Sequence, residues 1–240
     1  MCTSFVYRKE HVLIGMNFDN DGKKFRISTD GGNSFLVSVK VNHKYFPSIG
    51  VNRQGVFVND SIVDANGEGQ YKRQSAKRWV ATSLVQFIMG SDVTFADVKE
   101  VLEKVEIVNA PRASTHNLIV DAAGNSCVVE PGRRNIFSGG NDSEWCVVTN
   151  FPLSDYEEIT PMTVSGSGSD RYQTVVAQLS KVTKPLTVQE GFDILKSVKQ
   201  DGPEWKTQLS LIYDGRRKKL FHCLDQKYDE IIEYGFQQTT

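Results

Sequence analysis

The order of apolar patterns along the chain is the feature that most constrains its fold. The chain begins with strands at 2–59, continues with helices at 75–105, strands at 117–150 and helices at 170–199, and ends with strands at 207–236. Short β-branched runs between turn signals identify the strands, and apolar residues at helical spacing identify the helices. Helices in separate pairs between runs of antiparallel strands argue against a βαβ layout. The sequence therefore predicts an α+β fold, a four-layer αββα sandwich of two antiparallel sheets flanked by helical pairs.

Local signals predict some of the element boundaries. The segments 94–97 and 187–190 each have Thr at the first position and an acidic residue at the fourth, which is the pattern of a capping box at a helix start. The first helix is expected over residues 75–89, after a polar surface loop over residues 60–73. Residues 25–28 are short and are expected to be irregular.

Cys2 follows the initiator methionine directly, so removal of Met1 would place a thiol and a free α-amine on one residue. An α-amine titrates near ~7.7 to 8 and a thiol near ~8.5, so the amine can accept the thiol proton close to neutral pH. The hairpin expected over residues 2–7 and 11–19 would hold this residue at a strand end. Cysteine is also common as a small buried hydrophobe, and position alone leaves both readings open.

The length and the net charge of the chain restrict the kinds of partner that it can be expected to bind. The 240 residues carry a formal net charge of -1, which provides no basic surface for nucleic acid or an anionic membrane. No stretch approaches the ~20 apolar residues that span a bilayer, and no signal-peptide pattern opens the chain. We expect a single domain over residues 1–240, located in the cytoplasm and acting on a small molecule. The assembly state stays open, with a homo-oligomer among the alternatives.

The cysteine spacing predicts neither a zinc site nor a disulfide framework. Cys2, Cys127, Cys146 and Cys223 are widely separated and form no CxxC pair. We expect the last three to be core residues within strands, and we expect no metal or organic cofactor.

Five short elements, taken together and in order, resemble the choloylglycine hydrolase family, which includes bile salt hydrolases and penicillin V acylases. The elements are Cys2-Thr3, Gly15-Met16-Asn17-Phe18-Asp19, Asn59 after Gly55-Val56-Phe57-Val58, Val148-Thr149-Asn150-Phe151-Pro152, and Ser169-Asp170-Arg171-Tyr172. The resemblance runs across nearly the whole chain. It implies the N-terminal nucleophile hydrolase fold, an exposed N-terminal cysteine, and hydrolysis of non-peptide linear amides without a cofactor.

The resemblance also implies roles for five residues. Cys2 would be nucleophile and base, and Asp19 would be the partner of its α-amine. Asn59 and Asn150 would help to build the oxyanion hole and to order the N-terminal residue, and Arg171 would be a fixed cation that favours the thiolate. Taken singly, the two asparagines and Asp19 also fit turn positions, and Arg171 fits an accessible first turn of a helix.

One departure concerns position 16, where Met16 stands in place of the arginine usual in the family. The predicted function is a cysteine N-terminal nucleophile amidohydrolase that cleaves linear C–N bonds through an acyl-enzyme. An acyltransferase, an acyl-lactone hydrolase and a catalytically silent binding protein on the same fold stay open as alternatives. So does a histidine base such as His11 or His116.

Overall fold

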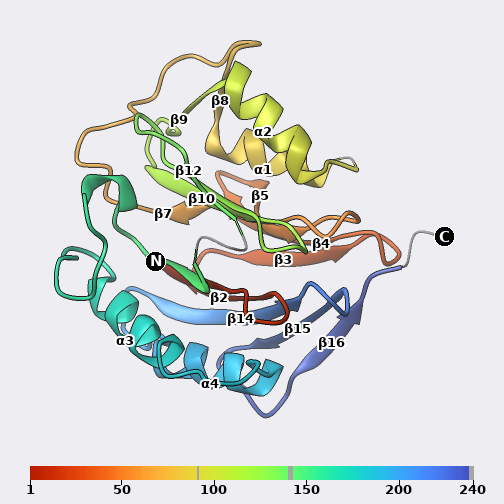
Figure 1. Ribbon diagram of the computed structural model, residues 1–240. Helices are drawn as coiled ribbons and strands as arrows, with labels where there is room; N and C mark the ends of the chain where they lie inside the picture. The colour runs from red at the N-terminus through yellow and green to blue at the C-terminus, as the bar shows by residue number, and fades with distance from the viewer. Residues whose placement is uncertain (91, 140–142, 238–240) are drawn as a thin grey trace. The chain divides into compact units, whose positions relative to one another are not determined.

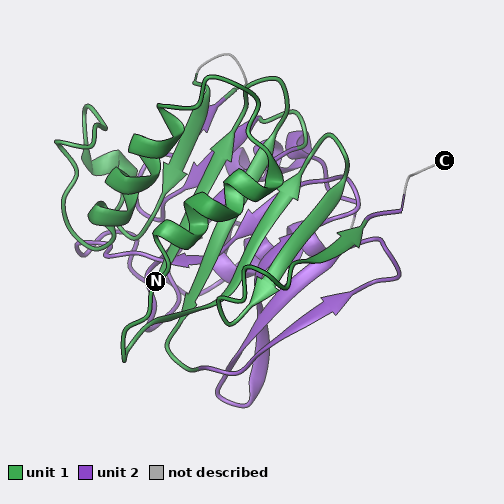
Figure 2. Ribbon diagram, turned by 90° about the horizontal axis from the view of Figure 1, so that it is seen from below, with its two compact units in different colours: residues 1–22, 122–124, 139–235 green, residues 23–121, 125–138, 236–240 purple. Residues whose placement is uncertain are grey.

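The computed structural model describes residues 1–90, 92–139 and 143–237, and the chain divides into two compact units (Figure 2). Unit 1 comprises residues 1–22, 122–124 and 139–235, and unit 2 comprises residues 23–121, 125–138 and 236–240. Each unit contains a large antiparallel sheet and a pair of helices (Figure 1). The single domain expected over residues 1–240 stays a prediction, which this division does not decide.

Unit 1 is built on a six-stranded sheet with two helices packed on one face (Figure 1). In spatial order its strands are β13 (Trp145–Val148), β1 (Cys2–Tyr7), β2 (Leu13–Asn20), β14 (Lys206–Asp214), β15 (Lys219–Leu224) and β16 (Ile232–Gly235). Helix α3 (Ser169–Leu179) contacts β1 and β13, and helix α4 (Val188–Ser197) contacts β2 and β14. Strands β1 and β2, the second and third in this order, are buried along their whole length.

The register of β1 and β2 decides which side chains share a face with Cys2. Cys2 lies opposite Phe18, and Thr3 lies opposite Asn17. Asn17 Nδ2 donates to the Leu195 carbonyl of α4 over 2.8 Å, so Thr3 and Asn17 face the helices. Because strand side chains alternate, Cys2 and Phe18 lie on the opposite face of the sheet.

Gly15 is required by the close packing between β1 and β2. A Cβ at this position would lie 2.2 Å from Cε1 of Phe5, the residue that pairs with Gly15. A glycine therefore lets the Phe5 ring fill the space over β2, beneath α4.

Unit 2 is built on an eight-stranded sheet that α1 (Ala81–Met89) and α2 (Phe95–Lys104) cover on one face. Its strands are, in spatial order, β12 (Ile136–Ser138), β11 (Ser126–Val129), β10 (Thr115–Val120), β6 (Phe57–Asn59), β5 (Lys44–Val51), β4 (Phe35–Val41) and β3 (Phe25–Thr29), with β7 (Ser61–Ile62) paired to β10 as well. The helices bury Leu84, Ile88 and Val98 against Val58 and Ile119 of the sheet.

The first helix begins later than the sequence predicts. Residues Arg78–Val80 form a strand, β8, which pairs in parallel with β9 (Glu106–Val108). Arg78 Nε donates to Glu106 Oε2 over 2.6 Å beside this pairing. The helical spacing that includes Trp79 was therefore overridden by a contact with a segment nearly thirty residues away.

Two further segments are more regular than expected. Residues 25–28 belong to β3, which pairs with β4 along its length, and the expected loop over residues 60–73 contains β7. Both predicted capping boxes are confirmed: Thr94 accepts from the Asp97 N–H at the start of α2, and Thr187 accepts from the Glu190 N–H at the start of α4. In the described part of the chain no helix is both long and apolar enough to cross a bilayer.

Candidate active site

Cys2 is the first residue of β1 and is buried, with its main chain held on both sides. Its N–H donates to Asn150 Oδ1 over 3.1 Å, and its carbonyl accepts from Arg171 Nη1 over 2.7 Å. Asn150 follows the last residues of β13, and β13 pairs with β1 at Ser4. Strand pairing therefore brings Asn150 beside Cys2 although 148 residues separate them in the sequence.

The chain carries Met1, so the nitrogen of Cys2 is an amide here. The Met1 ammonium donates to the main-chain oxygen of Asp19 over 2.9 Å, and burial lowers the pKa of this α-amine. The Met1 sulfur accepts from Ser167 Oγ over 3.1 Å. Cys2 gains a basic nitrogen only when Met1 is removed.

Arg171 connects the groups around Cys2. Besides the Cys2 carbonyl, its Nη1 donates to Thr3 Oγ1 over 2.6 Å, and its Nη2 donates to Asn150 Oδ1 over 2.6 Å. The planar guanidinium holds five N–H donors in a fixed fork and so directs several such bonds at once, whereas an ammonium has three donors on a rotating group. The expectation of an accessible position is wrong, because Arg171 is only 3% exposed.

Gly168 explains how Arg171 reaches the strand. This residue precedes α3 and has a φ of 81°, in the left-handed region. A Cβ at Gly168 would lie 2.6 Å from Arg171 Nη2 and 3.0 Å from Thr149 Cβ. The absence of a side chain there lets the first turn of α3 place the guanidinium against β1.

The buried carboxylate of Asp19 contacts side chains from two elements, β14 and α3. Its Oδ1 accepts from Thr207 Oγ1 of β14 over 2.6 Å, and its Oδ2 lies 3.6 Å from Arg171 Nη1. Burial raises the pKa of Asp19 to about 6, although the Thr207 bond and the Arg171 charge both oppose the rise. Asp19 therefore carries a full negative charge only above about pH 6.

The hydrogen bonds of Asn150 orient its amide. A backbone N–H and a guanidinium can only donate, so the atom that faces Cys2 N and Arg171 must be the oxygen. Nδ2 then points away from these two groups. Asn150 is thus oriented as an amide donor, which is what stabilisation of an oxyanion needs.

Asn59 belongs to unit 2, whereas Cys2, Asp19, Asn150 and Arg171 lie together in unit 1. Asn59 is the last residue of β6 and is fully buried. Its Oδ1 accepts from Leu118 N over 2.8 Å, so its Nδ2 is also directed away from a fixed donor. In both asparagines, therefore, the side-chain oxygen accepts from neighbouring donors and the side-chain nitrogen points away from them.

Sequence reasoning missed two residues of the cluster, Thr3 and Thr207. Thr3 accepts from Arg171 and could have been found, because it stands next to Cys2 in the first motif. Thr207 had no local signal, since its contact with Asp19 depends on the pairing of β2 with β14.

The other cysteines are structural. Burial raises the pKa of Cys127 to about 12 and that of Cys223 to about 11, and it also raises the pKa of Cys146. All three lie in strands, as predicted, although Cys146 is only partly buried. Such thiols are poor nucleophiles at neutral pH.

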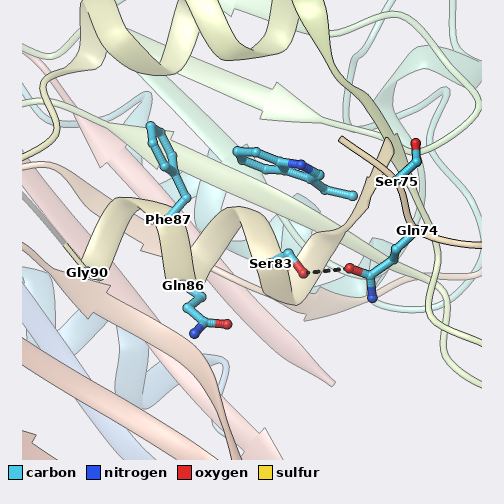
Figure 3. Close-up of a pocket in the computed structure, with 7 residues that line it drawn as sticks. Gln74, Ser75, Ser83, Gln86, Phe87 and Gly90 are labelled. Carbon is cyan, nitrogen blue, oxygen red and sulfur yellow. Dashed lines mark hydrogen bonds between the residues drawn. The ribbon is translucent and has the colours of Figure 1, made fainter. Parts of the chain in front are cut away.

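A hollow beside α1 in unit 2 differs from the cluster around Cys2 in that none of the described side chains lining it is ionisable (Figure 3). It has a volume of about 520 Å³ and is lined by Gln74, Ser75, Trp79, Ser83, Gln86, Phe87 and Gly90. None of these side chains is ionisable, and none belongs to the predicted site. Among the residues that the structure describes, no cluster of His, Cys, Asp or Glu could hold a metal ion.

The whole chain resembles solved structures of amide-cleaving enzymes. A mutant of conjugated bile acid hydrolase from Clostridium perfringens superposes with a TM-score of 0.66 at 16% identity, covering 100% of this chain and 98% of that one. Penicillin V acylase from Agrobacterium tumefaciens gives a TM-score of 0.64 at 19% identity over 93% of this chain and 83% of that one. An orthologue of N-acylethanolamine-hydrolyzing acid amidase from Caenorhabditis elegans gives 0.60 at 12% identity, covering 89% and 93% of the two chains. These likenesses confirm the predicted α+β fold as that of the N-terminal nucleophile hydrolases.

The sequence itself defines the family. Residues 12–174 match the family of linear amide C–N hydrolases, choloylglycine hydrolase family. This chain belongs to that family and is a hydrolase of linear amide bonds. No protein of curated function matches it in sequence.

Proposed function

We propose that this chain is a cytoplasmic cysteine N-terminal nucleophile amidohydrolase that cleaves a small acyl-amide through an acyl-enzyme on Cys2. The observation that carries the proposal is the double anchoring of Cys2, whose N–H bonds Asn150 and whose carbonyl bonds Arg171. A nucleophile that is also a chain terminus must be held in this way, because a terminus without such bonds frays.

The reaction begins after Met1 is lost. The Cys2 α-amine accepts the thiol proton, directly or through one water, and the thiolate attacks the carbonyl carbon of the amide. The electron pair of the C=O bond moves to oxygen, where Nδ2 of Asn150 or of Asn59 donates to the new oxyanion. When the C–N bond breaks, the α-ammonium protonates the departing nitrogen and an acyl thioester remains on Cys2.

Water then releases the acid. The α-amine, neutral again, accepts a proton from water, and the resulting hydroxide attacks the thioester carbonyl. Collapse of the second oxyanion expels the Cys2 thiolate, which takes the proton back. Each amide consumed therefore yields one carboxylic acid and one amine, and the enzyme is regenerated without a cofactor.

Arg171 and Asp19 would set the electrostatics of this cycle. Arg171 lies against the Cys2 carbonyl and contributes a fixed positive charge that favours the thiolate. Asp19 offsets part of that charge and lies where the Met1 amine now binds its main-chain oxygen. The pair holds the N-terminal residue in register while the proton moves between its sulfur and its nitrogen.

The face of the unit 1 sheet on which Cys2 lies favours an apolar acyl group. Met16 and Phe18 of β2, and Leu211 opposite Met16 on β14, lie on that face and are buried. Charged acyl groups would lose hydration beside such a surface without gaining a partner. We therefore expect a fatty, aromatic or sterol-like acyl group.

Turnover and covalent trapping test the proposal together. Purified protein, with loss of Met1 confirmed by intact mass, is incubated with glycocholate, penicillin V or an N-acyl amino acid. Acid-quenched samples are then analysed by mass spectrometry for an acyl thioester on the protein. The expected result is release of free amine from at least one compound and an acyl mass on Cys2. Cys2→Ala should abolish both, whereas Cys223→Ala should keep both.

Three outcomes would contradict the proposal. Hydrolysis by Cys2→Ala would identify another nucleophile, and binding of these amides without any turnover by the processed protein would favour the silent binding protein. Transfer of the acyl group to an added amine faster than to water would identify an acyltransferase.

A further inference from the structure

We propose that Asn117, a residue of β10 in unit 2, is a positioning residue that holds Asn59 in its donor orientation. The inference rests on the proposed function, in which Asn59 is an oxyanion donor. It deepens that function, because none of the motifs that resemble the family includes Asn117.

The pairing of β10 with β6 and β7 is interrupted at Asn59. Phe57 pairs with Val120 and Val58 with Ile119, and after the interruption Ser61 pairs with His116. The register is the same on both sides of the gap, so Asn59 lies opposite Leu118 without a bulge. In an uninterrupted ladder the Leu118 N–H would donate to the Asn59 carbonyl.

Two side chains replace that main-chain bond. The Leu118 N–H donates to Asn59 Oδ1 over 2.8 Å, and the Asn59 carbonyl accepts from Asn117 Nδ2 over 2.7 Å. Asn117 therefore supplies the donor that the Asn59 carbonyl would otherwise take from Leu118. Because the carbonyl is satisfied, the Leu118 N–H is left to fix the side-chain oxygen of Asn59.

Asn117 does this from the other side of the sheet. It pairs with Val129, which lies in the core beneath α1 and α2 together with Val58 and Ile119. Strand alternation then places Asn117 on the helix-covered face and Asn59, next to Val58, on the opposite face. Asn117 thus reaches Asn59 only through its main chain, which is why it is a positioning residue and not a catalytic one.

Loss of Asn117 Nδ2 should let the ladder close. The Asn59 carbonyl would accept from the Leu118 N–H, and Asn59 Oδ1 would lose its anchor. The backbone groups would remain paired, so stability should change little while the orientation of the amide is lost.

The experiment compares Asn117→Leu with Asn59→Ala, the double variant and a matched control. The control is Asn52→Leu, since Asn52 is also a buried asparagine of unit 2 whose Nδ2 donates to main-chain carbonyls, those of Ile88 and Val93. Steady-state kinetics use glycocholate and penicillin V as probe substrates, with iodoacetamide alkylation of Cys2 and urea unfolding measured in parallel.

We expect Asn117→Leu to lower kcat roughly 10- to 100-fold, a part of the 10²- to 10³-fold loss typical of a missing oxyanion donor. KM, alkylation and the unfolding midpoint should change little. The double variant should be no slower than Asn59→Ala alone, because Asn117 acts only through Asn59. Asn52→Leu should lower the unfolding midpoint and keep kcat.

Unchanged kcat in Asn117→Leu, or a double-variant loss equal to the product of the single losses, would overturn the inference. A crystal structure of Asn117→Leu provides a readout that does not need turnover. The inference expects Leu118 N to bond the Asn59 main-chain oxygen, and persistence of the bond to Asn59 Oδ1 would overturn it. If the wild-type protein hydrolysed none of the three amides offered above, the proposed function would fail, while this structural readout would still decide the role of Asn117.

Discussion

The two units orient a buried asparagine in the same way but with different chemistry. In unit 1 the oxygen of Asn150 accepts from Arg171, whose charge Asp19 partly offsets, and from the nitrogen of Cys2. In unit 2 the oxygen of Asn59 accepts from a neutral backbone N–H. The first arrangement changes with pH and with any change of charge, whereas the second depends only on strand pairing. Variants that alter charge should therefore separate the two regions.

Arg171→Ala should have the largest effect, because it breaks the charged arrangement of unit 1 at its centre. It removes donors from Cys2, Thr3 and Asn150 and leaves the Asp19 carboxylate buried without its cation. Loss of one partner of a buried pair typically costs about 3–5 kcal/mol of unfolding free energy. We expect such a loss in urea unfolding, with a fall of kcat/KM of roughly 10³-fold as the oriented donor is lost.

The matched control is Arg217→Ala, since Arg217 also faces an aspartate of unit 1, Asp214, at 3.6 Å, but is itself exposed. It should change stability by less than about 1 kcal/mol and leave kcat/KM intact. Equal effects of the two variants would remove Arg171 from the site.

Asn150→Ala and Asn59→Ala should each lower kcat roughly 10²- to 10³-fold, because each removes a proposed oxyanion donor. Their effects on Cys2 itself should differ. Asn150 touches the Cys2 nitrogen, so its loss should also change the rate of iodoacetamide alkylation at Cys2. Asn59→Ala should leave alkylation unchanged. An alkylation change in both variants, or in neither, would mean that the two asparagines do not have separate roles.

The pH dependence of stability also distinguishes the two units. Burial raises the pKa of Asp19 in unit 1 and that of Asp60 in unit 2, each from 3.8 to about 6. A carboxyl with a raised folded-state pKa favours folding below its unfolded-state pKa, and this contribution is lost as pH rises to and beyond about 6. The unfolding free energy should therefore fall between about pH 4 and pH 6 on account of these groups.

Asp60→Asn should remove its share of that fall, up to about 3 kcal/mol for a shift of about two pKa units. The variant should be more stable than the wild type at pH 7, as measured by urea unfolding at several pH values. Asp19→Asn should bring no such gain, because it leaves Arg171 buried without its carboxylate. A wild-type slope retained in Asp60→Asn would assign the titration to other groups.

Met16→Arg should have the smallest effect on turnover, which it changes through the pKa of the Cys2 thiol. Because Met16 is fully buried, the variant should also lower the unfolding free energy. Met16 lies opposite Ser4, on the face of the sheet that Cys2 occupies. A cation there should lower the pKa of the Cys2 thiol by about one unit, the low end for a nearby charge. The pH dependence of iodoacetamide alkylation measures this shift, and Met16→Leu is the neutral control. No shift would mean that another group already supplies the charge.

Local chemistry made part of this structure predictable. The capping boxes at Thr94 and Thr187 depend on residues three apart, and the block order of strands and helices depends on short periodic patterns. Cys2 and Asn150 could be singled out because each stands inside a compact motif. These features need no knowledge of which strand lies beside which.

Long-range pairing set the rest. Thr207 reaches Asp19 across 188 residues, and the burial of Arg171 follows from the packing of α3 on β1, which no periodicity reveals. The late start of α1 has the same cause, since β8 forms only because β9 is there to pair with it. The bond from Asn117 to the Asn59 carbonyl likewise exists only in the folded register.

The decisive experiment asks whether the α-amine of Cys2 is the general base. A glycine that cannot be removed is inserted ahead of Cys2, which keeps the thiol but converts its amine into an amide without useful basicity. Hydrolysis of glycocholate and penicillin V should fall roughly 10²- to 10⁴-fold, the usual cost of losing a general base. Iodoacetamide should still alkylate Cys2. Hydrolysis at the wild-type rate by the extended protein would show that the α-amine is not the base, and a histidine such as His11 or His116 would have to take that role.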